Sequence, residues 1–128
     1  MVRGRFVCYN CWVNRVFVFG SNLAGRHGKG AAQDARNQFG AEYGVGVGRT
    51  GNAYAIPTKD FFIKRLPATA IQNHVNNFIE YAKANPTVCF FLTRIGCGLA
   101  GYTDNQIAPM FKGVPKNVIA PEEWKDYL

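Results

Sequence analysis

The sequence contains no apolar run that could cross a membrane. A membrane helix needs roughly 18 uninterrupted apolar residues, and no stretch of the chain approaches that length. The N-terminus carries Arg3 and Arg5, but neither an apolar run nor a small-residue cleavage site follows them, so the pattern of a secretory signal peptide is missing. We therefore expect a cytoplasmic protein without a membrane partner.

Acidic residues are also scarce. Eight Asp and Glu stand against fifteen Lys and Arg, which gives a formal net charge of +7. The basic residues are scattered, and they form no block of about five or more like charges. Such a surplus favours anionic partners, and composition alone leaves nucleotide phosphates and nucleic acid as equal candidates.

Residues that bind metals are few. Cys8 and Cys11 form a Cys-x-x-Cys pair, but the two further ligands that a zinc site of this kind needs do not follow at matching spacing. The other two cysteines stand alone, Cys89 in an apolar run and Cys97 between glycines. We predict that the chain has no metal site.

Apolar residues, in contrast, are plentiful enough for a core. Of the 128 residues, 48% are hydrophobic, and this length is typical of one domain. No repeat, linker or low-complexity tract divides the chain. We expect one domain over residues 15–128, preceded by an irregular segment, 1–14, with an added edge strand through Phe6 and Val7 as an alternative.

Strand-like and helix-like segments alternate along the chain. Short apolar runs predict strands at 15–19, 53–56, 88–92 and 117–120. Apolar residues at helical spacing predict helices at 31–39, 67–84 and, after a capping box, 103–111. The glycine-rich segment 40–51, between the helix at 31–39 and the strand at 53–56, is interpreted as a loop. The alternation predicts an α/β domain with helices on both faces of its sheet.

Two glycine-rich loops follow predicted strands and lead into predicted helices. The first runs from Gly20 to Gly30, and the second from Gly96 to Gly101. In open α/β sheets, ligands bind at the carboxyl ends of the strands, and the N–H groups of a helix start attract anions. Two such loops on neighbouring strands would suit a diphosphate, although ordinary turns remain the alternative. Neither the P-loop motif nor the Gly-x-Gly-x-x-Gly dinucleotide motif is present.

The loop residues resemble those of macrodomains, a family that binds ADP-ribose. Asn22 is followed eight positions later by Gly30, with Gly28 between them and a small-residue helix after them, as in the first ligand loop of that family. The stretch 98–102 (Gly-Leu-Ala-Gly-Tyr) resembles its second loop, which wraps the diphosphate. The resemblance covers about Val16 to Ile119. It implies a three-layer α/β/α fold with a mixed, mainly parallel central sheet.

The stretches 56–59 and 94–99 are similar to the macrodomain branch that removes ADP-ribose from acidic side chains or DNA bases. The resemblance implies that Asn22 contacts the distal ribose and that backbone donors and basic side chains meet the diphosphate, without metal or cofactor. The ligand contacts that it implies are Ser21, Asn22, His27, Gly28, Lys29, Gly30, Thr58, Gly96, Cys97, Gly98, Leu99, Ala100, Gly101 and Tyr102.

The chain also departs from that branch. Lys59 occupies the position of the family lysine that attacks or contacts the ribose, but Ala100 replaces the assisting aspartate. Asp104 is a candidate replacement for that acid. The Asp-Ile pair with which many macrodomains hold adenine is missing, so adenine recognition is unexplained. We expect binding of ADP-ribose or a related ligand, with hydrolysis of an ADP-ribosyl linkage, non-catalytic reading of such a signal, and nucleic-acid binding as alternatives.

Several of these residues also have simpler interpretations. Lys59 could form a surface ion pair with Asp60, and His27 could lack any role toward a ligand. Phe61 and Phe62 could stack on a base or fill the edge of the core.

Overall fold

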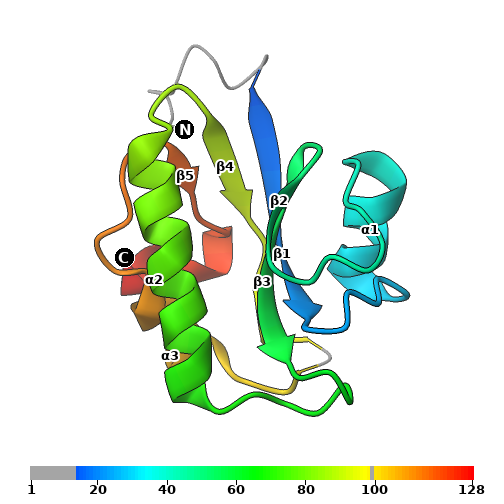
Figure 1. Cartoon of the computed structure of the whole chain (residues 1–128). Helices are drawn as coiled ribbons and strands as arrows, with labels where there is room; N and C mark the ends of the chain where they lie inside the picture. The colour runs from blue at the N-terminus through cyan, green and yellow to red at the C-terminus, as the bar shows by residue number, and fades with distance from the viewer. Residues whose placement is uncertain (1–13, 99) are drawn as a thin grey trace.

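The computed structural model describes residues 14–98 and 100–128, and within them a five-stranded sheet forms the centre of the molecule (Figure 1). The strands are β1 (Arg15–Asn22), β2 (Gly48–Thr50), β3 (Ala53–Lys59), β4 (Cys89–Leu92) and β5 (Val118–Ile119). The helices are α1 (Gly30–Gln38), α2 (Ala68–Ala84) and α3 (Asp104–Ile107), with 3₁₀ segments η2 (Ala108–Phe111) and η3 (Glu122–Tyr127). The predicted edge strand through Phe6 and Val7 lies outside the described residues.

The order of strands across the sheet is β2-β3-β1-β4-β5. The central strand β1 pairs in parallel with β3 on one side and β4 on the other, and β5 continues the parallel arrangement. Only the edge strand β2, which pairs with β3, is antiparallel among the described strands. The prediction of a mixed, mainly parallel sheet is therefore confirmed, and the strands that precede the two glycine-rich loops are neighbours.

Helices cover both faces of the sheet, which confirms the three layers (Figure 1). On one face, α2 buries its predicted apolar side against β1, β3 and β4, through Ile71, Val75, Phe78, Ile79 and Ala82. On the other face, α1 buries only Ala32 and Ala35, which pack with Phe19 of β1. Because these side chains are so small, the backbone of α1 lies close to the sheet and its N-terminus is held near the end of β1.

Two strands are longer than predicted, and both extensions reach the carboxyl edge of the sheet. β1 continues to Asn22, and β3 continues through Pro57 to Lys59. Proline was expected to end β3, because it has no N–H to donate to a neighbouring strand. β2 pairs with β3 only as far as Ala55, so on the β2 side no strand lies opposite Pro57 and no hydrogen bond is lost there. β2 itself was predicted to be loop.

The third helix begins where its sequence predicts but ends sooner, at Ile107 and not at Phe111. Thr103 and Gln106 form the capping box that opens α3. Pro109 then lies at the start of η2, where the chain changes from α to 3₁₀ geometry because proline cannot continue the α-helical hydrogen bonds. Among the described residues, no helix is both long and apolar enough to span a membrane, and no group of His, Cys, Asp and Glu is placed to hold a metal ion.

Candidate functional site: a cationic pocket at the carboxyl end of the sheet

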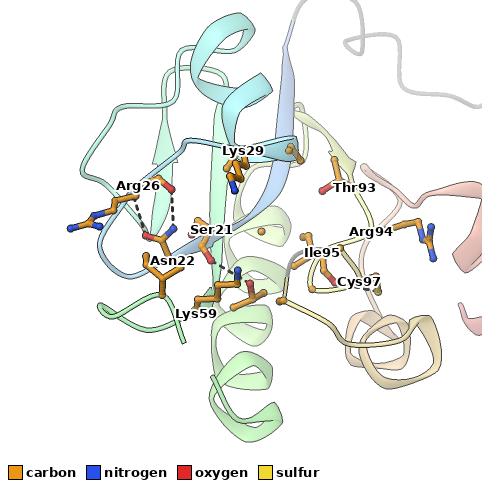
Figure 2. A pocket seen from close by; sticks show the side chains of 18 of the residues that line it. Ser21, Asn22, Arg26, Lys29, Lys59, Thr93, Arg94, Ile95 and Cys97 are labelled. Atoms are coloured by element: carbon orange, nitrogen blue, oxygen red, sulfur yellow. Dashed lines mark hydrogen bonds between the residues drawn. The ribbon is translucent and has the colours of Figure 1, made fainter. Parts of the chain in front are cut away.

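A pocket of about 620 Å³ lies where β1, β3 and β4 end, within the usual range for sites that hold a small ligand (Figure 2). The two glycine-rich loops form its walls. Its lining residues are Gly20, Ser21, Asn22, Arg26, Gly28, Lys29, Gly30, Ala31, Ala32, Thr58, Lys59, Ile63, Thr93, Arg94, Ile95, Gly96, Cys97, Gly98 and Ala100. The structure thus brings together eleven of the predicted residues: Ser21, Asn22, Gly28, Lys29, Gly30, Thr58, Lys59, Gly96, Cys97, Gly98 and Ala100.

Asn22 holds the first loop in shape. Its Nδ2 donates to the carbonyl of Arg26, and its Oδ1 accepts from the N–H of Arg26, both at 2.9 Å (Figure 2). The amide still has one N–H and one lone pair free for a ligand. Asn22 is therefore fixed in place before any ligand arrives, at one end of the pocket.

The segment 40–48 supports this loop from behind. Ser21 Oγ donates to the carbonyl of Gly46 at 2.5 Å, and the N–H of Gly44 donates to the carbonyl of Gly25 at 2.8 Å. The backbones approach so closely that a Cβ on Gly46 would lie 2.0 Å from the carbonyl oxygen of Asn22, and one on Gly25 would lie 2.2 Å from Gly44. Only glycine fits at these two positions.

The N-terminus of α1 opens onto the pocket. Lys29 is its N-cap and provides no side-chain hydrogen bond, while Gly28 to Ala32 line the cavity. The first N–H groups of a helix have no partner within the helix, and together with the helix dipole they attract anions. A Cβ on Gly28 would meet no atom within 4 Å. The absence of a side chain there therefore leaves space for a ligand rather than for protein.

The second loop also contains one glycine at which a Cβ would contact protein atoms and one at which a Cβ would contact none. Gly96 has a φ of 79°, and a Cβ on it would lie 3.2 Å from Ile107, so this glycine serves the turn. A Cβ on Gly98, in contrast, would meet no atom within 4 Å, and Gly98 lines the pocket. The loop closes through hydrogen bonds from the N–H of Gly101 to Gly98 and from the N–H of Tyr102 to Gly96. Leu99 lies outside the described residues.

The charge of the pocket has one sign. Four lining residues are cationic, namely Arg26, Lys29, Lys59 and Arg94, and no Asp or Glu is among the described residues that line it. The side chains of Arg26 and Arg94 point away from the cavity (Figure 2), and Arg94 forms an ion pair with Asp104, so the two lysines provide the positive charge of the pocket. Low-dielectric walls strengthen the field that such a group of charges creates. The pocket is suited to a ligand with two or more negative charges.

Lys59, the candidate catalytic residue, lies at the end of β3 and reaches the pocket (Figure 2). The predicted alternative, an ion pair with Asp60, is not among the ion pairs of the described residues. Asp60 instead accepts hydrogen bonds from the N–H groups of Phe62 and Lys64. The ammonium group of Lys59 therefore remains available to a ligand.

That same turn displays two aromatic rings. Phe61 is 64% exposed and Phe62 is 82% exposed, so the prediction that they fill the edge of the core is wrong. Ile63, which follows them, adopts a φ of 64°, a left-handed conformation that is rare for a β-branched residue, and it lines the pocket. Sequence reasoning missed Ile63, because its backbone conformation has no marker in the sequence.

Asp104 cannot replace the missing acid of the second loop. Its carboxylate accepts two hydrogen bonds from Arg94, at 3.0 and 2.7 Å, and a third from Trp124 Nε1 at 2.7 Å. These partners, Arg94 first, lower the pKa of Asp104 to about 2. Burial, with a smaller contribution from Asp104, raises the pKa of the Cys97 thiol to about 12. Neither group is poised for proton transfer or nucleophilic attack near neutral pH.

Three predicted contacts lie outside the lining of the pocket: His27, Gly101 and Tyr102. The hydroxyl of Tyr102 donates to the carbonyl of Leu66, and the guanidinium of Arg65 covers its ring. The His27 ring is fully buried and meets Phe19 and Tyr43 edge to face. These side chains support the loops from behind, and the structure does not bring them to the ligand space.

His27 should make the stability of the protein depend on pH. Burial lowers the pKa of His27, with the backbone of Val45 opposing and Arg36 adding to the effect, and neither ring nitrogen has a hydrogen-bond partner of good geometry. As the pH falls, the unfolded chain therefore takes up its proton first, and stability is lost below the ordinary histidine pKa of about 6.5.

We expect His27→Leu to reduce the decrease in unfolding temperature between about pH 7.5 and about pH 5, as measured by calorimetry. Burial also lowers the pKa of His74, so the double variant His27→Leu/His74→Gln should show a still smaller decrease in unfolding temperature. Identical pH profiles for His27→Leu and the wild-type protein would contradict a neutral, buried His27.

The order and pairing of the strands and the helices on both faces make a macrodomain-like fold, with the pocket at the carboxyl end of its sheet. Among solved structures, the chain is similar to Thermosipho africanus DarTG in complex with ADP-ribose, with a TM-score of 0.58 and 15% sequence identity. The match covers 88% of this chain and 39% of that chain, so this chain spans about two fifths of the neighbour's length. No protein-family model and no curated protein matches the sequence.

Proposed function

We propose that this protein binds ADP-ribose or a closely related nucleotide diphosphate in the pocket between its two glycine-rich loops. One observation carries the proposal: the N-terminus of α1 opens into a pocket that Lys29 and Lys59 line, and no carboxylate is among the described residues that line it. A diphosphate is the ligand group that such a pocket would neutralise. The structural neighbour is in complex with ADP-ribose, which supports the same ligand class here.

The proposed contacts follow the length of the pocket. The diphosphate meets the N–H groups of Gly28 to Ala32 on one side and the loop from Gly96 to Ala100 on the other. The distal ribose lies beside Asn22, whose amide keeps one donor and one acceptor free, and beside the ammonium group of Lys59. The side chain of Lys29 adds positive charge near the diphosphate.

Calorimetric titration with ADP-ribose at moderate salt tests the proposal directly. We expect saturable binding with one ligand per chain. The same protein is titrated with a single-stranded oligonucleotide at several salt concentrations, because binding through many phosphates weakens steeply as salt rises. Steeply salt-dependent binding of the oligonucleotide, without any binding of ADP-ribose, would favour nucleic-acid binding instead.

Hydrolysis of an ADP-ribosyl linkage is a second candidate, and the availability of Lys59 favours it. If the protein is such an enzyme, Lys59→Ala should lower turnover by about 100-fold or more and lower ligand affinity by much less. Lys64→Ala is the matched control, because Lys64 is an exposed lysine in the same turn that does not line the pocket. Equal losses of turnover and affinity in Lys59→Ala would assign Lys59 to binding alone.

The absence of a carboxylate among the described lining residues favours non-catalytic reading of an ADP-ribose signal over hydrolysis. Tight binding without turnover of any ADP-ribosyl substrate would support this function as a reader or sponge.

A further inference from the structure

The two ends of the pocket are held in different ways (Figure 2). At one end, Thr93 is tied to the central strand, because its N–H and its hydroxyl both donate to the carbonyl of Val18, at 3.1 and 2.9 Å. At the other end, Asn22 lies opposite Lys59 in the register of β1 and β3, and the chain turns back directly after Lys59. The turn at residues 60–64 therefore belongs to the end of the pocket that Asn22 and Lys59 form.

The turn 60–64 has the hydrogen bonds of a three-residue hairpin loop. The N–H of Asp60 donates to the carbonyl of Lys64 at 2.7 Å, and the N–H of Ile63 donates to the carbonyl of Asp60 at 3.1 Å. The Asp60 carboxylate also accepts from the N–H groups of Phe62 and Lys64. In such loops the last residue adopts the left-handed conformation, and Ile63 does so with a φ of 64°. The shape of the turn is therefore set by its own hydrogen bonds.

Isoleucine does not suit its position in this turn. Glycine adopts the left-handed conformation without strain and asparagine tolerates it, whereas a β-branched residue is strained there. Among the described residues, Ile63 is the only non-glycine residue with a positive φ. Burial in the core does not compensate, because Ile63 is 36% exposed and its neighbours Phe61 and Phe62 are 64% and 82% exposed. Ile63 instead lines the pocket, and strain that the core does not explain is typical of ligand sites.

From this geometry we infer that Ile63 is a specificity-determining residue that packs against the distal ribose of the ligand. The inference rests on the proposed function, which places that ribose beside Asn22 and Lys59. The hydroxyl groups of the ribose bind these two polar side chains, and the carbon atoms of its ring offer an apolar face to Ile63. Glycine at position 63 would relieve the strain but leave this face in water. The pocket should therefore prefer a nucleoside diphosphate that carries a second ribose over one that does not.

The test compares Ile63→Gly and Ile63→Asn with the wild-type protein, because both variants fit the left-handed position and neither keeps the branched apolar side chain. In calorimetric titrations, we expect each variant to bind ADP-ribose about tenfold more weakly and to bind ADP, which lacks the distal ribose, within about twofold of wild type. The unfolding temperature of Ile63→Asn should be at or above the wild-type value, because the strain is relieved. In the wild-type complex, NMR should show nuclear Overhauser effects between the Ile63 methyl protons and the distal ribose protons.

Phe62→Ala is the matched control and should bind both ligands as the wild-type protein does, because Phe62 is an exposed residue of the same turn that does not line the pocket. Unchanged ADP-ribose affinity in both Ile63 variants would overturn the inference. An equal loss of ADP affinity, or unfolding temperatures lower by about 5 °C or more in both, would also overturn it, because the shape of the turn would then explain the role of Ile63. These results leave the proposed function intact as long as the wild-type protein binds ADP-ribose. A wild-type protein that binds no ADP-ribose would overturn both.

Discussion

Replacing Gly98 by glutamate is expected to abolish ADP-ribose binding and to leave the unfolding temperature within about 3 °C of the wild-type value. A side chain at this position meets no protein atom within 4 Å of its Cβ, so the fold should accept it. The new carboxylate would extend into the space that the diphosphate occupies in our proposal. Repulsion between this carboxylate and the negatively charged diphosphate should weaken binding by more than about 100-fold. Calorimetric titration and thermal unfolding measure the two effects.

Gln33→Glu is the matched control for this substitution. It makes the same change in net charge on an exposed position of α1, outside the lining of the pocket. We expect its affinity for ADP-ribose to stay within about threefold of wild type, since an exposed charge is screened by water and salt and the new side chain takes up no space in the pocket. Normal binding by Gly98→Glu would show that the second loop does not border the ligand.

The second large effect concerns stability. Gly46→Ala should lower the free energy of unfolding by about 3 kcal/mol, as measured by urea denaturation. Its Cβ would lie 2.0 Å from the carbonyl oxygen of Asn22, which is backbone at the end of the central strand and cannot move aside alone. Ligand affinity should fall together with stability, because Asn22 lines the pocket.

Gly28→Ala provides the comparison, because a Cβ at Gly28 would meet nothing within 4 Å and its φ is not in the left-handed region. We expect a change of no more than about 0.5 kcal/mol in its free energy of unfolding. Equal stability of Gly46→Ala and Gly28→Ala would mean that segment 40–48 does not support the first loop as described.

The parts of the fold that sequence predicted are those whose side chains repeat with a period. The apolar face of α2 and the apolar run of β4 were both found, because burial on one face or on both faces of a sheet leaves a direct pattern. β2 was missed: Gly48–Thr50 is three residues long, none of them is buried, and its pairing with β3 is a long-range contact. The length of β3 was missed because Pro57 is a strand breaker only where a partner strand needs its N–H.

The outline of the pocket was predicted because a glycine marks, in the local sequence, a place where the backbone can turn tightly or approach a ligand closely. Gly28 and Gly98 were placed at the pocket for that reason, and both line it. The side chains were harder, since their direction depends on partners that are distant in the sequence. The burial of His27 depends on Tyr43, and the position of Tyr102 depends on the carbonyl of Leu66.

The tie between Thr93 and the central strand has a consequence for the motions of the site. Thr93 is anchored to Val18, and Ser21 and Asn22 are themselves part of β1, which has a hydrogen-bonded neighbour on each side. The base of the pocket therefore belongs to the segment of the chain that opens last, when the sheet itself is lost. We therefore expect the residence time of a ligand to depend on the loops at the rim and not on the strands.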